Sequence, residues 1–350
     1  MCINKLNVQN FTVFEEIEIE LCKNINIFIG ENGTGKTHLL KLIYGVIDIY
    51  NSKNRHDGKS IYLWQYFLSA NGNNKYFVRD ISKACDIEIK AADYEIIFNV
   101  YKEDNNRNKF ENNFILKTSP TNSIKKQPDN IVFIPAKEML SHSKGFLALE
   151  REREIPFDKT LINIISKAEL GEAKQISDFQ SNLIKILSKI IDGNVIFEND
   201  TFYVIKNNGL KIEFSMEAEG FRKFGLIWKL IKNGLIEKNT LLLWDEPEAN
   251  INPQLMPVLV DIILEMQRNG VQIFIATHDY NLAKYFEINR KNNDEVLYHC
   301  LYKTNSKGVK CSKATNYKNI LNNPIEKANE KLYNEILEKA PEDIENGQDN

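Results

Sequence analysis

The stretch that decides the fold is FIGENGTGKTHLLKL, residues 28–42. An apolar run ends at Gly30, a glycine-rich turn follows, and the turn closes with Gly35, Lys36 and Thr37 just before an apolar pattern of helical spacing. This order matches the phosphate-binding loop G-x-x-x-x-G-K-[ST] in full. Its glycines let backbone N–H groups turn inward around phosphate oxygens, and the N-terminus of the next helix favours an anion. The stretch therefore predicts an α/β fold with a nucleotide site at a strand-to-helix turn.

Two side chains of this loop are predicted to act on the phosphates. Lys36 can reach the β- and γ-phosphates, and the Thr37 hydroxyl can hold Mg²⁺. A chance match is the weaker alternative, because an apolar strand precedes the loop and a helical pattern follows it. The residues predicted here to bind the nucleotide are Gly30, Asn32, Gly33, Thr34, Gly35, Lys36, Thr37 and His38.

A pair of carboxylates follows a second apolar strand, in TLLLWDEPEANINP at residues 240–253. Ligands of open parallel sheets bind at the carboxyl ends of the strands, so this segment and the phosphate-binding loop can converge. We expect Asp245 to hold Mg²⁺ and Glu246 to polarise the attacking water. Two solvated carboxylates are the alternative, which the apolar residues before the pair and Pro247 after it disfavour.

A histidine ends a third apolar strand, in VQIFIATHDY at residues 271–280. A lone histidine is more often structural or exposed. The position of His278 directly after a buried strand favours a contact with the γ-phosphate at the same sheet edge.

Composition limits the classes of protein that the chain can belong to. It has 350 residues, 43% hydrophobic and 27% charged, typical of a soluble globular protein with one large domain or two lobes. The net charge of -3 provides no global basic field, so nucleic acid would meet a local patch or a partner. The five cysteines form no CxxC pair, which favours reduced thiols. With no apolar run of about 20 residues and no apolar signal core, we expect a cytoplasmic protein without membrane contact.

The pattern along the chain predicts an α/β fold with a mixed sheet core, a β-rich lobe and a helical lobe. Residues 1–135 are expected to form an N-terminal lobe with the phosphate-binding loop and an antiparallel β subdomain. Residues 136–215 would add a helical insertion, with a long helical pattern over 160–192, and a β-hairpin with an Asn-Gly turn. Residues 216–350 would form the C-terminal lobe.

That lobe is expected to end in an amphipathic helix. Its apolar face would carry Ile325, Ala328, Leu332 and Ile336. The face could bind a partner or pack on the core of the protein itself, and the spacing alone leaves both open.

These segments resemble the motifs of an ABC-type ATPase of the RecF/SMC/OLD-like branch. The chain is most similar to the compact AAA-like ATPases of bacterial antiphage systems, such as the Septu-like ones. The matching segments are FIGENGTGKTHLLKLIY for Walker A, LLLWDEPEANINP for Walker B and D-loop, IATHDYNLA for the H-loop, SMEAEGFRKFGLI for a variant signature, and FIPAKEML. Order and spacing match over roughly residues 1–285, although residues 50–200 match only in general layout. The resemblance implies a P-loop NTPase fold with an ABC-ATPase-like head.

The resemblance also implies a mechanism. Two heads would dimerise around two ATP molecules with Mg²⁺ bound by Thr37 and Asp245. Lys36, Glu246 and His278 would act in hydrolysis, and residues 248–250 would lie along the dimer seam. The residues of the signature that would face the γ-phosphate of the partner are Ala218, Glu219, Gly220 and Arg222.

The chain departs from the family pattern at two places. Ala218 stands where the signature has a serine, so one hydroxyl contact to the γ-phosphate is missing. No glutamine can be assigned to the Q-loop, and Gln65 is a weak candidate that equally fits a polar position on an apolar helix. Both departures predict slow, regulatory hydrolysis by a switch.

The first functional hypothesis is an ATPase that dimerises, or forms a higher homo-oligomer, and controls a separate effector in antiphage defence. That effector would be a nuclease or toxin, and nucleic acid could be bound directly or through it. The alternative is a RecF-like repair or recombination ATPase, with a basic strip at residues 123–126 or at Lys144, Arg151 and Arg153. A transporter subunit is disfavoured by the atypical signature, and a GTPase by the lack of NKxD.

Overall fold

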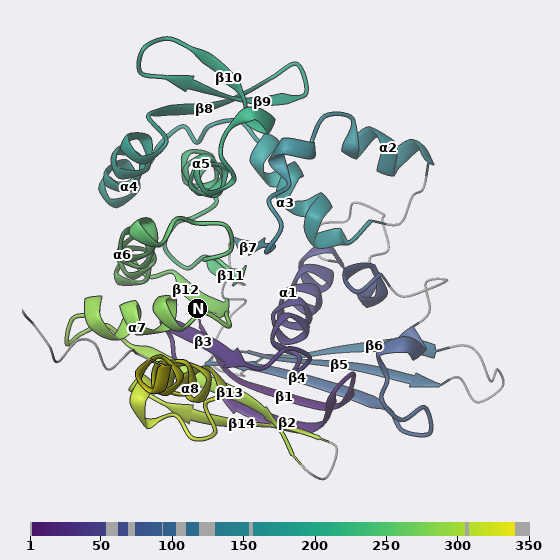
Figure 1. Cartoon of the computed structure of the whole chain (residues 1–350). Coiled ribbons are helices and arrows are strands. Elements are labelled where there is room, and N and C mark those ends of the chain that lie inside the picture. Colours follow the sequence, from purple (N-terminus) through teal and green to yellow (C-terminus); the bar gives the residue numbers. More distant parts are fainter. Residues whose placement is uncertain are drawn as a thin grey trace, which may run out of the picture.

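In the computed structural model the chain folds around a six-stranded sheet with a second, antiparallel sheet beside it (Figure 1). The structure describes residues 2–53, 62–68, 74–92, 94–102, 110–118, 130–153, 157–304 and 308–339. The main sheet has the order β14-β13-β3-β12-β11-β7. Its strands are β3 (Ile25–Gly30), β7 (Ile131–Ile134), β11 (Leu241–Asp245), β12 (Gln272–Ala276), β13 (Val296–Lys303) and β14 (Val309–Ala314).

The five strands from β13 to β7 run parallel, and β14 pairs with β13 antiparallel. Parallel strands share one carboxyl edge, so the residues that follow β3, β11, β12 and β13 meet there. This arrangement confirms the predicted mixed sheet of an α/β fold.

Two smaller sheets flank the main one. The antiparallel sheet has the order β2-β1-β4-β5-β6 and the small meander the order β10-β9-β8. The strands are β1 (Ile3–Phe11), β2 (Phe14–Glu20), β4 (Cys85–Ala91), β5 (Tyr94–Lys102), β6 (Phe110–Thr118), β8 (Gly193–Glu198), β9 (Thr201–Lys206) and β10 (Lys211–Glu213). The predicted hairpin thus has a third strand, because Asn199 and Asp200 form a second turn with positive φ.

Helices cover both faces of the main sheet (Figure 1). They are α1 (Lys36–Lys53), α2 (Phe146–Arg153), α3 (Lys159–Glu169), α4 (Asp178–Ile190), α5 (Glu219–Lys232), α6 (Met256–Arg268), α7 (Tyr280–Asn289) and α8 (Pro324–Lys339). Within the described residues, no helix combines the length and apolar character that a membrane span requires.

The two faces of the main sheet belong to two separate hydrophobic cores. Ile25, Ile27 and Ile29 of β3 pack in the core of the helical side, whereas Phe28 packs with α1 and the antiparallel sheet. This is the period-2 alternation of a strand that is buried on both faces. Helix α1, which begins at the phosphate-binding loop, is therefore enclosed between two sheets.

The helical pattern over residues 160–192 forms two helices, α3 and α4, with a break between them. Helix α3 ends at Glu169, and α4 begins after Ser177. Ser177 and Gln180 form a capping box, in which the serine side chain accepts from the Gln180 N–H and the glutamine side chain accepts from the Ser177 N–H. The cap signal starts a new helix because it satisfies N–H groups that a continuous helix would bond internally. The boundaries of the three expected domains stay a prediction.

Candidate nucleotide-binding site

The phosphate-binding loop joins β3 to α1, as its sequence predicts, and only glycine fits at its two ends. Gly30, Gly33 and Gly35 all have positive φ, 148°, 76° and 89°. A Cβ on Gly30 would lie 2.3 Å from the Leu301 carbonyl oxygen, and one on Gly35 would lie 2.5 Å from Phe14 Cζ. The backbone of the loop is thus held close to β13 on one side and to β2 on the other, which fixes the positions of its N–H groups.

Lys36 lies inside this loop. Its Nζ donates to the carbonyl oxygens of Gly30 and Glu31, at 2.7 and 3.1 Å. Burial lowers the pKa of Lys36, and the nearby carboxylates of Glu246 and Asp245 oppose that shift. An ammonium enclosed by backbone in this way is placed for phosphate oxygens.

Thr37 and Asp245 are brought together from distant parts of the chain. Thr37 Oγ1 lies 3.0 Å from each carboxylate oxygen of Asp245 and donates to them. Burial raises the pKa of Asp245 to about 6, while the hydrogen bond from Thr37 lowers it. A hydroxyl and a carboxylate are the hard oxygen ligands that Mg²⁺ takes together with nucleotide phosphates. No cluster of three or more His, Cys, Asp or Glu side chains suited to a metal occurs among the described residues.

Glu246 and His278 meet beside this pair. His278 Nδ1 lies 3.1 Å from Glu246 Oε1, and both side chains are partly exposed. Glu246 has a φ of 45°, in the left-handed region, and its backbone N–H donates to the Ala276 carbonyl at 2.8 Å. A strained backbone of this kind is typical of functional sites, where the surrounding contacts hold it in place. The Glu246 side chain lines the same hollow as Lys36 and Thr37.

A second layer of buried charge lies behind Glu246. The Lys223 Nζ donates to the Glu246 carbonyl oxygen at 3.2 Å, and burial lowers the pKa of this lysine. Thr277 Oγ1 donates to Glu248 Oε1 at 2.6 Å, and burial raises the pKa of Glu248 to about 7. Our sequence analysis missed Lys223 and Thr277. The sequence offered one signal for these two residues: Lys223 follows the signature residue Arg222, and Thr277 precedes His278.

The hollow at the sheet edge has a volume of about 240 Å³. It is lined by Val13, Asn32, Gly33, Gly35, Lys36, Thr37, His38 and Glu246. Of the predicted nucleotide ligands, Gly30 contributes its carbonyl to Lys36, and Thr34 is buried and donates its hydroxyl to the Glu31 carbonyl at 2.8 Å. Val13, at the turn between β1 and β2, was missed because nothing in its local sequence marks it.

His38 lies at the base of this hollow. Its ring packs edge-on against Phe11 and Phe67, and burial lowers its pKa. Within the described part of the chain, its Nδ1 is buried without a hydrogen-bond partner. The predicted contact of His38 with the nucleotide stays a prediction.

The predicted signature residues lie at the start of α5 and do not line this hollow. A Cβ on Gly220 would lie 3.0 Å from the Asn250 carbonyl oxygen, and Asn250 Nδ2 donates to Glu219 Oε1 at 2.8 Å. Arg222 Nε lies 3.2 Å from the buried carboxylate of Glu138. Ala218 precedes the helix as its N-cap without a side-chain hydrogen bond. The contact of these residues with a partner's nucleotide stays a prediction.

The Q-loop candidate is also outside the hollow. The side chain of Gln65 accepts a hydrogen bond from the Tyr62 N–H and so caps a short 3-10 helix, Leu63–Tyr66. This local capping is the structural role that the sequence left open for Gln65.

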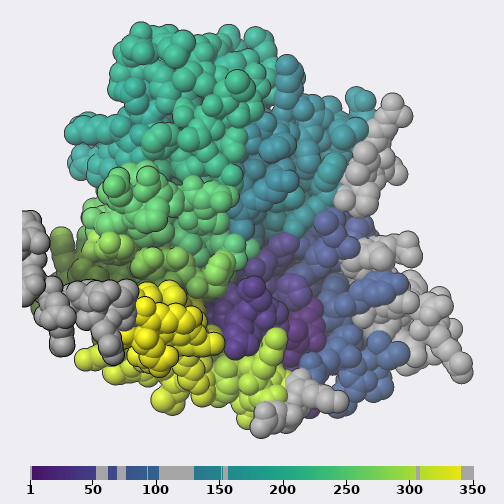
Figure 2. Space-filling model, in the orientation of Figure 1, coloured from purple at the N-terminus to yellow at the C-terminus, as the bar shows by residue number. Residues whose placement is uncertain are grey.

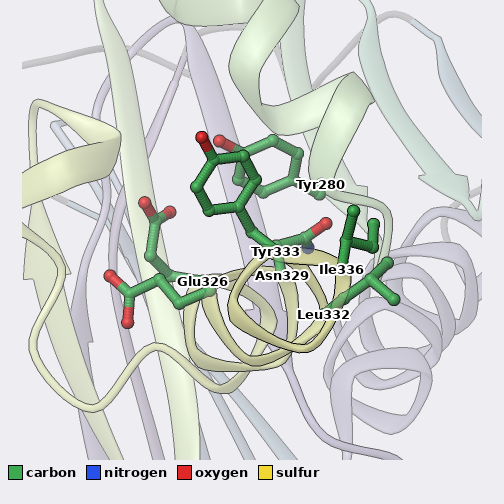
Figure 3. A pocket seen from close by; sticks show the side chains of 7 residues that line it. Tyr280, Glu326, Asn329, Leu332, Tyr333 and Ile336 are labelled. Carbon is green, nitrogen blue, oxygen red and sulfur yellow. The ribbon is translucent and has the colours of Figure 1, made fainter. Parts of the chain in front are cut away.

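A second hollow lies beside α8 (Figure 3). Its volume is about 380 Å³, and it is lined by Tyr280, Glu326, Asn329, Glu330, Leu332, Tyr333 and Ile336. On α8, Ile325 is buried, whereas Leu332 and Ile336 are 56% and 58% exposed. Helix α8, yellow in Figure 2, lies at the surface, so most of its apolar face is not packed on the core.

Comparisons with known proteins agree with this geometry. A solved SMC head, titled as bound to the C-winged helix domain of ScpA, superposes with a TM-score of 0.53 at 14% identity, over 91% of this chain and 99% of that one. RecF, a DNA replication and repair protein of Clostridium tetani (strain Massachusetts / E88), is 42% identical over 65 residues, 19% of this chain and 17% of RecF. The arginine transport ATP-binding protein ArtP of Haemophilus influenzae is 41% identical over 54 residues, 15% of this chain and 22% of ArtP. The chain thus spans less than a quarter of these two curated relatives.

The likeness to the solved SMC head shows that the chain has an SMC-head-like P-loop fold. A family model described as "AAA domain, putative AbiEii toxin, Type IV TA system" matches residues 25–284. The chain belongs to this family. The predicted family relationship and the predicted SMC-like head fold are thereby confirmed.

Proposed function

We propose that this protein is an ATP-driven switch that dimerises around Mg·ATP, hydrolyses it slowly, and controls a separate effector, a nuclease or toxin, in antiphage defence. The observation that carries the ATPase part is the convergence of three sequence segments at one sheet edge. There Thr37 bonds to Asp245, and His278 lies beside Glu246. Lys36 donates to the loop backbone and is near the carboxylates of both pairs. Lys36, Thr37 and Glu246 line the same hollow, and Asp245 and His278 contact Thr37 and Glu246 beside it, which supports this proposal.

The residues act on the nucleotide in distinct roles. Lys36 and the loop N–H groups bind the phosphates, while Thr37 and Asp245 hold Mg²⁺, which neutralises phosphate charge when it is bound. Glu246 accepts a hydrogen bond from the attacking water and orients it toward the γ-phosphorus. His278, 3.1 Å from that carboxylate, keeps it in position and donates to the γ-phosphate.

The proposed dimer supplies the other half of the site. The start of α5 packs against Asn250, so the signature and the D-loop form one continuous surface. The helix N-terminus at Gly220 suits the γ-phosphate of a second copy, because its N–H groups and dipole favour an anion. Slow turnover is expected because Ala218 provides no hydroxyl and Arg222 is bonded to Glu138 within the same chain.

The proposal of a separate effector is supported by the family description and by the exposed apolar face of α8. The family description names a toxin and a toxin–antitoxin system, and the matched SMC head was solved with a domain of another protein. On α8, Leu332, Tyr333, Ile336 and Leu337 are all more than half exposed. Contiguous apolar surface of this kind is typical of protein interaction sites, and we assign it to the effector. We place the whole process in the cytoplasm.

The test is the Glu246→Gln variant, which keeps the shape of the side chain and removes its basicity. We expect it to bind Mg·ATP and to accumulate as a dimer, measured by light scattering after gel filtration. A Lys36→Ala variant is the control and should stay monomeric under the same conditions. A monomeric Glu246→Gln protein that nevertheless binds ATP would refute the dimer. Co-purification from the native host with Glu246→Gln as bait then tests for the effector, and recovery of no nuclease or toxin would contradict that part.

A RecF-like repair ATPase is the second candidate, supported by the local similarity to RecF. The basic run at residues 123–126 lies outside the described residues, Lys144 is exposed, and Arg151 and Arg153 are on α2. This reading requires an ATP-dependent affinity for duplex DNA that falls steeply with salt. A binding titration at two salt concentrations, with and without ATP, separates the two candidates.

A further inference from the structure

The register of the main sheet brings the end of β13 beside the phosphate-binding loop. β13 and β3 are parallel neighbours, and Leu301 pairs with Gly30, the first residue of the loop. The Leu301 carbonyl would lie only 2.3 Å from a Cβ on Gly30, so no side chain separates the two strands there. Two residues after this pair, Lys303 at the end of β13 and Asn32 in the loop lie next to each other.

Lys303 is exposed, and its Nζ reaches the loop itself. The Nζ donates to the Asn32 carbonyl oxygen at 3.4 Å and would lie 3.6 Å from a Cβ on Gly33. Asn32 and Gly33 both line the nucleotide hollow. Lys303 itself does not line the hollow, but its ammonium contacts two residues that do, from the β13 side of β3, whereas Asp245 ends β11 on the other side.

The charges around the hollow leave this ammonium with a weak partner. Among the described residues, no carboxylate forms an ion pair with Lys303, whereas Lys313 on the neighbouring β14 is paired with Glu20. A long hydrogen bond to one carbonyl uses one of the three donors of an ammonium. Phosphate oxygens form shorter, charge-assisted bonds and would displace it. Among the described residues that line the hollow, Lys36 provides an ammonium and Glu246 a carboxyl group.

We propose that Lys303 is a second phosphate-binding cation, whose Nζ donates to a non-bridging oxygen of the γ-phosphate from the β13 side. The proposal rests on the proposed function, because it requires that the hollow binds a nucleoside triphosphate. Lys303 then distinguishes ATP from ADP, since its partner is present only in the triphosphate. It would also pull the ends of β13 and the loop together when ATP is bound.

The experiment compares ATP and ADP affinity by calorimetry with Mg²⁺ in the Glu246→Gln background, which does not consume ATP. Lys303→Gln should weaken ATP binding by about tenfold or more, the range of a charge-assisted hydrogen bond, and leave ADP within about twofold. Lys303→Arg should restore most of the ATP affinity. Lys310→Gln, a change of an exposed lysine on the same hairpin, is the matched control and should change neither.

Each other outcome overturns a defined part of the proposal. An equal loss for ATP and ADP would mean that Lys303 only holds the Asn32 backbone, and no loss for either would mean that it does not touch the nucleotide. Both results leave the proposed function intact, because the parent protein still binds ATP. A parent protein that binds no ATP, in the same way as a Lys36→Ala control, would refute the proposed function and this role of Lys303 together.

Discussion

The Thr37 hydroxyl lies 3.0 Å from both carboxylate oxygens of Asp245, although the two residues are 208 positions apart. Thr37 is the second residue of α1, the helix that follows β3, and Asp245 ends β11, with β12 between the two strands. Because β3, β12 and β11 run parallel, the residues that follow them meet at one edge of the sheet. The pair therefore joins the start of the helix that follows the loop to the end of a strand two places away in the sheet.

Asp245 should make the stability of the nucleotide-free protein depend on pH. Its folded pKa of about 6 is above its ordinary value of 3.8. The raised pKa stabilises the folded state below about pH 4, and that contribution is lost as pH rises to 6, where the buried carboxylate ionises. At pH 8, Asp245→Asn should therefore be more stable than the parent, by on the order of 2 kcal/mol. At pH 4 the difference should vanish.

Urea denaturation of both proteins without Mg²⁺ or nucleotide, at pH 4 and pH 8, measures this difference. Asp178→Asn, an exposed carboxylate at the start of α4, is the control and should follow the parent. Equal stability of Asp245→Asn and parent at pH 8 would contradict the raised pKa. The same residue predicts that Mg·ATP affinity drops as pH falls through about 6, because a protonated carboxyl cannot hold the metal.

Lys223→Met should reduce the rate of hydrolysis without weakening nucleotide binding. The Nζ of Lys223 holds the carbonyl of Glu246, while no part of its side chain lines the hollow. Releasing this carbonyl lets the carboxylate move, and a displacement of about 1 Å can cost on the order of a hundredfold in rate. Steady-state kinetics should show a lower kcat with KM unchanged.

The matched control for that variant is Lys229→Met, which removes another buried lysine of α5 two turns further on. It should leave kcat within about twofold of the parent value. If both variants lose the same activity, the effect belongs to the packing of α5 and not to the contact with Glu246. Methionine keeps most of the lysine stem, so the fold of the helix is preserved in both.

Gly35→Ala should abolish nucleotide binding, whereas Gly209→Ala should not. The two glycines have nearly the same φ, 89° and 86°, so alanine costs roughly 1–2 kcal/mol of backbone strain at either. They differ in surroundings, because a Cβ on Gly35 would lie 2.5 Å from Phe14, while no atom lies within 4 Å of one on Gly209. Calorimetric titration with ATP measures the outcome, and similar affinities for both variants would mean that the loop adapts to the extra carbon.

The exposed face of α8 should be needed for the effector and dispensable for the ATPase. Leu332→Glu and Ile336→Glu place charges on residues that are more than half exposed, so the free energy of unfolding should change by no more than about 0.5 kcal/mol. Hydrolysis should stay at the parent rate, while co-purification of the effector should be lost.

Two results would redirect the assignment of this face. Loss of the ATP-bound dimer in these variants would assign it to a second copy of the chain. Unchanged effector recovery would leave it without a role in either contact. Ile325→Glu, at the buried start of α8, is the destabilising control and should lower stability by about 2 kcal/mol or more.

The motifs that depend on local order were predictable from the sequence. A strand, a glycine-rich turn and a helix follow one another at Gly30 to Lys36, and an apolar strand ends at Asp245, so pattern and chemistry agree there. The split of residues 160–192 was not foreseen, because the apolar period continues across the break and only the cap at Ser177 marks it.

Residues that act through long-range register could not be found in this way. Lys303 is one of many exposed lysines in the sequence, and only the pairing of Leu301 with Gly30 places it at the loop. Lys223 likewise became visible only when α5 was packed against the strand end that carries Glu246. Strand order and helix packing determine the positions of these two lysines, and a local sequence pattern predicts neither.

The left-handed backbone of Glu246 has a consequence for the evolution of the protein. Glycine adopts that conformation without strain, so Glu246→Gly would relieve roughly 1 kcal/mol while it deletes the carboxylate. A laboratory selection for thermal stability alone should therefore enrich Glu246→Gly variants, which lack the carboxylate proposed for hydrolysis. Persistence of glutamate under such conditions would require that hydrolysis itself be under pressure.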